Sequence, residues 1–405
     1  MRLSRSNLKI SRSQLEISIV ATVLFVYAGF GDPTPDGVSW SEIVQAAGLI
    51  FLVLIGHSST RKGQHEPAFF LFLWFALIVG LSSSFANDIR QILRDVIAHM
   101  FFCFAVFWPR RLSSKEITWL MSVFSLAGGI IAFRFLIETG FSFSALDATT
   151  RFSFDGFLKL NTDPLVTFSA GYGIVALFDK RRLISTRGII FSFSLISMMA
   201  IGLSALRGPM AIVCVVAVVT LLRARIYRSW AGLLVFVVLL YFVMLNANLF
   251  GIFLDNFVAK MTNAGTSAKW NEFSHVMTTA GSDFISFFFG SGFGAKIDVG
   301  GRSLPFTHNA LSYYFAKTGV IGLMFLLLFI LGLVHRIVVT RKLLDPEVAL
   351  LIVIFLYGLT INPHYKYLTF GLVITLLLKK TERVREKRTA TDTNLREQAL
   401  SIERL

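Results

Sequence analysis

The sequence predicts an all-α integral membrane protein with about twelve transmembrane helices. Hydrophobic residues make up 55% of its 405 residues, charged residues only 16%, and the mean hydropathy is +0.68. Soluble proteins carry about 25% charged residues, so this composition excludes an ordinary soluble fold. It also excludes an intrinsically disordered chain, a collagen-like fibre and a disulfide-rich secreted domain.

Apolar runs of the length that crosses a bilayer as a helix recur along the chain. The expected spans are 17–31, 40–57, 68–86, 92–109, 117–137, 164–179, 187–205, 209–222, 229–249, 319–335, 347–361 and 367–379. They divide the chain into a first membrane part at 1–249 with a shorter outer loop at 138–163, a large loop at 250–317, a second membrane part at 318–380 and a polar tail at 381–405.

The basic residues predict the orientation. The net charge is +15, which in a soluble protein would indicate nucleic acid as a partner. With the N-terminus placed in the cytoplasm, most Lys and Arg fall in the predicted cytoplasmic segments, and the first outer loop, 32–39, has none. This is the pattern of the positive-inside rule. We therefore expect both termini in the cytoplasm, membrane lipids around the spans and no nucleic acid partner.

Arg207 lies where the predicted spans 187–205 and 209–222 meet, on the expected outer side. Pro209 suits the first position of a helix, because no backbone N–H is needed there. The following helix turns its positive dipole end outward, and a guanidinium beside it matches phosphate oxygens. These features indicate an anion site. The alternative is an interfacial arginine that reaches the lipid headgroups.

His308 and Asn309 lie near the end of the large loop. At the outer interface a neutral imidazole can accept a proton near pH 7, which indicates a general base. The alternative is a surface histidine or a helix cap, with Thr307 or Asn309 as the capping residue.

Weaker signals accompany these two. The stretch from Gly290 to Lys296 is only superficially similar to a phosphate loop, because no Gly-Lys-Ser/Thr follows, so we expect a turn or helix break. Arg90, Arg94 and Asp95 are spaced either for a structural ion pair or for a second anion contact. The outer loops contain no His-x-x-x-His, no Asp-x-Asp and no carboxylate cluster. We therefore expect no metal and no cofactor.

Several short motifs follow one another between residues 200 and 325. An Arg-Gly pair opens a span, a loop with a Gly-x-Gly element follows, and a His-Asn pair precedes a Gly-x-x-Gly-Leu helix. In this order they resemble the O-antigen polymerase and O-antigen ligase superfamily of bacterial envelope glycan assembly. The matching residues are Arg207-Gly208, Gly290-Ser291-Gly292-Phe293-Gly294, His308-Asn309 and Gly319-Val320-Ile321-Gly322-Leu323.

The resemblance implies a multi-pass glycosyltransferase of the bacterial inner membrane whose active site faces the periplasm. Its donor would be a glycan on undecaprenyl diphosphate, held by outer arginines, while the loop histidine assists the acceptor hydroxyl. Arg207 and His308 match these catalytic roles. The family often has an arginine a few residues before the loop tryptophan, where this chain has Lys269, which lacks the bidentate fork of a guanidinium. Lys269 could still supply the charge to the diphosphate as a point cation, and Arg302 and Arg151 are spare outer cations that could take its place. The implied loop contacts to substrate are Asn309 and Trp270.

The acceptor remains open at this level. We expect polymerisation, with another lipid-linked repeat unit as acceptor and a chain-length regulator as a further partner. The alternative is ligation to lipid A core. A transporter or flippase of lipid-linked glycan is a further alternative, but such proteins place broken helices and ionisable residues near the membrane midplane. Most predicted spans here lack interior charge.

Overall fold

A computed structural model describes residues 12–31, 40–56, 67–108, 112–139, 163–179, 182–204, 206–224, 273–279, 283–299, 302–304, 307, 309–340, 345–360 and 369–381. Nearly all of them are helical. The prediction of an all-α protein needs one small correction, because β1 (Ile297–Val299) and β2 (Arg302–Leu304) form an antiparallel hairpin.

Each predicted span except 229–249, which lies outside the described residues, overlaps helical residues, and the span 92–109 is divided between α4 and α5. Within the described part of the chain, three helices are long and apolar enough to cross a membrane: α6, α9 and α15. The chain is therefore a helical membrane protein. The helices are α1 (Arg12–Phe30), α2 (Trp40–Gly56), α3 (Pro67–Ser82), α4 (Ile89–Phe102), α5 (Phe104–Phe107), α6 (Ser114–Glu138), α8 (Pro164–Leu177), α9 (Ile184–Leu203), α10 (Arg207–Ala224), α14 (Phe284–Phe289), α15 (Ala310–Val339) and α16 (Pro346–Thr360), with further helical residues at 273–279 and 369–381.

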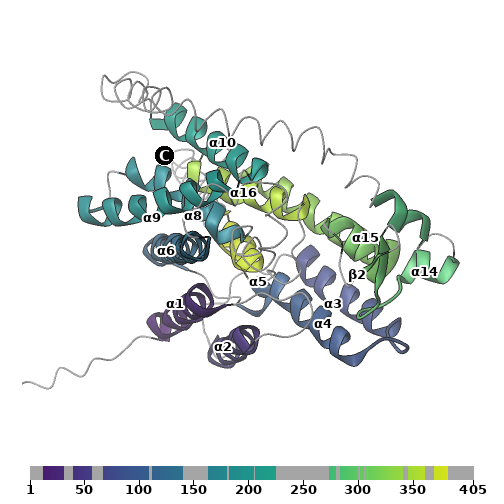
Figure 1. Ribbon diagram of the computed structural model, residues 1–405. Coiled ribbons are helices and arrows are strands. Elements are labelled where there is room, and N and C mark those ends of the chain that lie inside the picture. Colours follow the sequence, from purple (N-terminus) through teal and green to yellow (C-terminus); the bar gives the residue numbers. More distant parts are fainter. Residues whose placement is uncertain are drawn as a thin grey trace, which may run out of the picture.

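One hydrophobic core, to which α1, α3, α6, α8, α15 and α16 all contribute, joins two sets of packed helices (Figure 1). In the first, α8 is buried along nearly its whole length and contacts α6, α9, α10 and α16. In the second, α15 packs against α3 and α14. Small residues allow the close packing: a Cβ on Gly128 of α6 would lie 1.9 Å from the carbonyl oxygen of Leu165 in α8. This is the small-residue packing typical of membrane helices.

The helix α15 reverses direction at Gly319, whose φ of 62° and ψ of −163° are not helical. The ring of Phe72 in α3 lies 5.0 Å from the ring of Tyr314 and 6.3 Å from that of Phe329. In a straight helix Tyr314 and Phe329 would be about 22 Å apart along the axis. The two parts of α15 are therefore folded against each other. We call residues 310–318 the half-helix and residues 320–339 the long segment.

The half-helix points back into the molecule. Lys317 contacts Asp95 near the start of α4, and Tyr314 contacts His99 one turn further along that helix. The half-helix thus runs antiparallel to α4, and its first residue is the one most distant from Gly319. We call the side of the molecule where Gly319 lies the Gly319 side.

This arrangement corrects the predicted loop 250–317 at its end. Residues 310–317 are helical and largely buried, and the helix begins at Ala310 rather than at 318. The charge of Lys317 interrupts the apolar run in the sequence, and so the helix was expected to start after it. In the structure Asp95 neutralises that charge, and the lysine is buried with its partner.

We predict that Gly319→Ala destabilises the protein. An alanine there would need a backbone conformation that is essentially restricted to glycine, at a cost of about 1–3 kcal/mol. Its Cβ would also lie 2.3 Å from the carbonyl carbon of Phe288. The matched control is Gly202→Ala in α9, where a Cβ meets no atom within 4 Å. Thermal unfolding in detergent should show a lower Tm for Gly319→Ala only; equal Tm values for the two variants would contradict the reversal.

Candidate functional site

Arg207 is the first residue of α10. The next residue, Gly208, packs so closely against α16 that a Cβ on it would lie 2.0 Å from Cε2 of Tyr357. The backbone N–H of Met210 donates to the carbonyl of Leu206 at 3.1 Å and starts the helical pattern. The α10 N-terminus is therefore fixed in place, while the side chain of Arg207 lies outside the described residues.

Asn309 caps the half-helix, and its side-chain oxygen accepts the N–H of Leu311 at 2.8 Å. Thr307 is fully buried and donates its hydroxyl to the carbonyl of Asn309 at 2.8 Å. Ser312 donates to that same carbonyl at 3.0 Å. The capping role considered for Asn309 is thus confirmed. His308 lies outside the described residues, but the residues on both sides of it are held by hydrogen bonds.

Helix rise counted along these contacts gives the distance of Asn309 and of Arg207 from Gly319, which we call their depth. Asn309 is one half-helix away, or about 15 Å. In the long segment Phe329 is also about 15 Å from Gly319, and its ring lies 6.2 Å from that of Phe355 in α16. Tyr357, which contacts the start of α10, is then about 12 Å from Gly319. The N-termini of α10 and of the half-helix therefore start at similar depths.

A buried carboxylate lies at the same depth. Asp163 caps α8 and accepts hydrogen bonds from the N–H of Leu165 at 2.8 Å, the hydroxyl of Tyr27 at 2.7 Å and the hydroxyl of Thr369 at 3.4 Å. The ring of Phe370, next to Thr369, stacks on that of Phe355 at 5.9 Å, which sets the depth of this cluster. We call Asp163, Arg207, Asn309 and Thr369 the polar layer.

Of the helices that start in the polar layer, α8 is short. It has 14 residues, whereas about 20 are needed to cross the hydrocarbon core. Residues 320–339 form about 30 Å of helix, enough for a full crossing that ends at Gly319. Counted along the helices, the polar layer lies about one half-helix away from Gly319.

The glycine loop from Gly290 to Ala295 is a structural connection, as the turn prediction stated. Its backbone N–H groups are used by protein acceptors rather than left open for phosphate. Two of them donate to the last carbonyls of the half-helix, which a helix end otherwise leaves without partners. The bonds are Ser291 to Ala316 (2.8 Å), Gly292 to Lys317 (3.1 Å), Phe293 to Gly80 (2.9 Å) and Gly294 to Oδ2 of Asp95 (2.8 Å).

A buried ion pair joins this loop to α4 and the half-helix. Nζ of Lys317 lies 2.8 Å from Oδ2 of Asp95, and the two side chains are 1% and 2% exposed. Lys317 also donates to the carbonyl of Ala295. The structural ion-pair interpretation therefore holds for Asp95, although its partner was not foreseen. The sequence signal for this ion pair is a lysine next to the reversal, because a charge buried there needs a counter-charge.

His99 is a second buried residue that the sequence analysis missed. One ring nitrogen, Nε2, lies 3.1 Å from the carbonyl oxygen of Leu73, and the other, Nδ1, lies 3.0 Å from the hydroxyl of Tyr314. A carbonyl only accepts, so Nε2 carries the hydrogen and Nδ1 accepts from Tyr314. Both nitrogens are satisfied, and His99 ties α3, α4 and the half-helix together.

The remaining predicted site residues are only partly placed. Arg302 pairs with Val299 in the β-hairpin, and its side chain lies outside the described residues. Arg151, Lys269 and Trp270 also lie outside them. No group of three or more His, Cys, Asp or Glu among the described residues could hold a metal ion.

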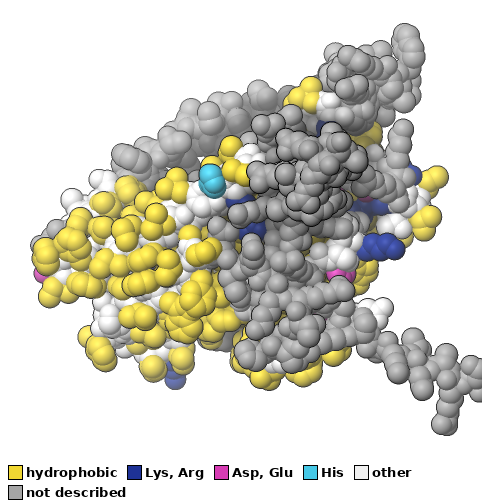
Figure 2. Space-filling view, turned by 180° about the vertical axis from the view of Figure 1, so that it is seen from behind, with side chains coloured by type: hydrophobic (Ala, Val, Ile, Leu, Met, Phe, Trp, Pro, Cys, Tyr) yellow, Lys and Arg dark blue, Asp and Glu magenta, His cyan; other side chains and the backbone are white. Residues whose placement is uncertain are grey.

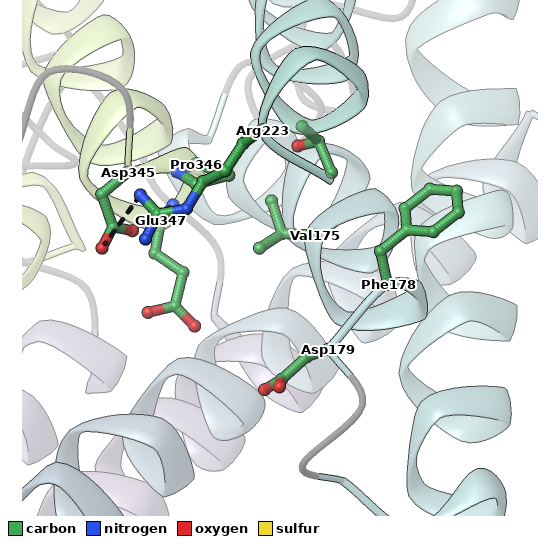
Figure 3. A pocket seen from close by; sticks show the side chains of 8 residues that line it. Val175, Phe178, Asp179, Arg223, Asp345, Pro346 and Glu347 are labelled. Atoms are coloured by element: carbon green, nitrogen blue, oxygen red, sulfur yellow. Dashed lines mark hydrogen bonds and ion pairs between the residues drawn. The ribbon is translucent and has the colours of Figure 1, made fainter. Parts of the chain in front are cut away.

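A cavity of about 330 Å³ opens at the opposite ends of α8, α10 and α16 (Figure 3). Its acidic residues are paired with cations: Asp345 lies 3.8 Å from Arg223, Asp179 lies 3.1 Å from Arg182, and Glu347 contacts Lys380. The cavity lies far along these helices from the polar layer and is not part of the same site.

A scan against models of known protein families finds no match, and no curated protein matches the chain. The assignment of a function therefore depends on the sequence motifs and on the geometry of the polar layer.

We predict that Asp95 and Lys317 are energetically coupled. Asp95→Asn and Lys317→Met each leave one buried charge without its partner, which costs about 3–5 kcal/mol. The double variant removes both charges and should be less destabilised than the sum of the two single variants. Thermal unfolding in detergent measures this cycle, with the exposed Arg90→Gln as a control that should change stability by less than about 0.5 kcal/mol. Strict additivity would contradict the coupling.

Proposed function

We propose that the chain is a multi-pass glycosyltransferase of the bacterial inner membrane that transfers a glycan from undecaprenyl diphosphate to a sugar hydroxyl. The observation that carries this proposal is the similar depth of two helix N-termini, one starting with Arg207 and the other capped by Asn309 directly after His308. Helix N-termini attract anions, and a guanidinium adds a fork that fits phosphate oxygens. Together they suit a diphosphate and an attacking group next to it.

The proposed orientation places the Gly319 side in the periplasm. The short connections at the opposite ends of the helices contain basic residues such as Arg110, Lys180 and Arg341. The positive-inside rule assigns such connections to the cytoplasm. A lipid-linked donor in the outer leaflet then reaches the polar layer from the membrane. The short α8 favours this access, because its N-terminus would then lie below the level of Gly319.

The donor carries its own leaving group, so the reaction needs no ATP. In the proposed step His308 takes the proton of the acceptor hydroxyl, and the hydroxyl oxygen bonds to the anomeric carbon. The bond from that carbon to the phosphate oxygen breaks, and undecaprenyl diphosphate leaves. Arg207 stabilises the charge that develops on the diphosphate. A positioned base of this kind contributes a rate factor of about 10²–10⁴.

Repeat-unit polymerisation is the preferred form of this reaction, as in the sequence analysis. In that case the acceptor is a second lipid-linked repeat unit. In the ligase alternative the acceptor is lipid A core. Deleting the protein separates the two: single repeats attached to the core indicate a polymerase, and a core without any repeat indicates a ligase.

A flippase or transporter of lipid-linked glycan is the second candidate, and the reversal at Gly319 favours it. Transporters use interrupted helices whose half-helix N-termini face anionic substrates inside the membrane. The half-helix here has this form, with its N-terminus about 15 Å from Gly319. The two candidates differ in where the lipid-linked glycan accumulates when the protein is lost: in the outer leaflet for a transferase, and in the inner leaflet for a flippase.

We predict that Arg207→Ala and His308→Ala each abolish long-chain glycan while the protein still inserts into the membrane. Arg207→Lys should recover only part of the activity, because lysine lacks the bidentate fork. The controls are Arg90→Ala and His275→Ala, two exposed residues outside the polar layer. Gels of surface polysaccharide give the chain lengths, and immunoblots of membranes give the protein level. Chain lengths as in wild type for both Arg207→Ala and His308→Ala would refute the assignment of the site.

A further inference from the structure

The Gly319 side carries a group of exposed apolar side chains that we call the apolar tip. Its members belong to the α3–α4 turn, to the start of α4 and to α14. The exposed fractions are 94% for Phe85, 64% for Ile89, 74% for Phe284 and 65% for Ile285. Exposing such side chains to water is unfavourable compared with burying them. An exposed apolar group of this kind marks a contact surface.

Hydrogen bonds hold the two halves of the apolar tip together. Oγ of Ser83 donates to the carbonyl of Phe289 at 3.4 Å. Nδ2 of Asn87 donates to the carbonyls of Ser291 at 3.0 Å and Phe293 at 2.9 Å. The α3–α4 turn and α14 therefore form one body, which presents its aromatic side chains as a unit.

The apolar tip continues a hydrophobic surface of the membrane helices. On α3 the exposed residues Phe75, Ile78 and Leu81 lead toward Phe85, and α15 exposes Leu327 and other apolar side chains beside them. The space-filling view from behind shows a broad hydrophobic face over this part of the molecule (Figure 2). A surface of this extent on a membrane helix faces lipid.

The contacts between α3 and α15 give the level of the tip. The rings of Phe75 and Phe325 stack at 4.2 Å. From this ring stack, Ser82 lies about 10 Å further along α3 and Gly319 lies about 9 Å further along α15, both toward the Gly319 side. The end of α3 is therefore level with Gly319. The long segment of α15 just spans the hydrocarbon core, which places Gly319 at its boundary. The apolar tip therefore lies at the level where acyl chains meet headgroups.

The polar groups near the tip fit this level. Asp283 caps α14, and the N–H of Ser286 donates to its carboxylate at 3.0 Å, which lowers the pKa of Asp283 below its usual value. It is thus charged at neutral pH. Asp88 and Arg90 are exposed at the start of α4. Charged side chains beside exposed aromatic residues are typical of the membrane interface.

The neighbouring helix at 273–279 has the opposite character. It buries Val276 and exposes Ser274, His275 and Thr278. Two adjacent elements on the Gly319 side thus expose different surfaces, one polar and one apolar. The polar helix at 273–279 and the apolar tip therefore contact different surroundings.

We propose that the apolar tip inserts into the lipid leaflet on the Gly319 side, with Phe85, Ile89, Phe284 and Ile285 among the acyl chains at the headgroup boundary. Part of the predicted large loop 250–317, from Asp283 onward, then lies against the bilayer instead of in water. The occupant of this surface is phospholipid. This inference is independent of the proposed reaction, since it depends only on exposure, composition and level.

Spin labels test this proposal on the full chain in phospholipid vesicles. Single cysteines replace Phe85 and Ile285 in a background with Cys103→Ala and Cys214→Ser, and each carries a nitroxide. The matched control is Ser274→Cys on the polar helix. Collisions with oxygen, which is enriched in the bilayer, are compared with collisions with a water-soluble nickel complex.

We expect labels at positions 85 and 285 to favour oxygen and the label at position 274 to favour the nickel complex, so the log ratio of the two accessibilities changes sign. A nickel-dominated ratio at 85 and 285 would overturn the proposal. Low access to both reagents at 85 and 285, with an immobile spectrum, would also overturn it, because it would show that protein covers the tip. Each labelled variant should unfold at the Tm of the wild-type protein, which establishes that the label is attached to folded protein.

Discussion

The fold on the Gly319 side depends on the chain reversal at Gly319, and that reversal depends on neutralising a charge buried inside the protein. Lys317 is two residues from the turn and fully enclosed, so it needs the carboxylate of Asp95 at 2.8 Å. Leaving either buried charge without its partner costs more free energy than the formation of the pair contributes to folding. The pair therefore acts mainly as a constraint on geometry. Asp95 also binds the N–H of Gly294, which brings the glycine loop onto the end of the half-helix. One carboxylate thus connects three segments that are far apart in the chain.

The depth of the polar layer follows from this reversal. Because the half-helix turns back, Asn309 caps a helix that begins about 15 Å from Gly319, instead of ending a loop at the level of Gly319. Backbone that is not helical can lie at such a depth only when its polar groups are satisfied by protein. The bonds that Thr307 and Ser312 make with Asn309 meet this requirement. The same reasoning explains why the N–H groups of the glycine loop donate hydrogen bonds to backbone carbonyls and to Asp95.

Hydropathy located the helices well, because a run of apolar residues is a local property. Hydropathy placed the start of α15 wrongly, because a charged residue such as Lys317 is typical of a loop unless its buried partner is known. The pairing with Asp95 spans more than two hundred residues, and no local pattern contains it. His99 was missed for the same reason: its partners lie on two other segments. For the candidate site, the sequence placed Arg207 beside a helix start and offered Asn309 as an alternative helix cap, but their similar distance from Gly319 needed the aromatic contacts of Phe329 and Phe355.

The depth of the polar layer bears on both candidate functions. A diphosphate cannot enter hydrocarbon without polar partners, because an unpaired ion in a low-dielectric medium is strongly disfavoured. An arginine and two helix N-termini at one depth supply such partners in either case. A transferase needs, in addition, a base beside the anion, and His308 is the residue that the chain places directly before the half-helix. A flippase needs no base, but it needs the half-helix to be accessible from both sides in turn. The pair of Lys317 and Asp95 holds the half-helix to α4 in one position, and this rigidity fits a fixed catalytic site better than an alternating one.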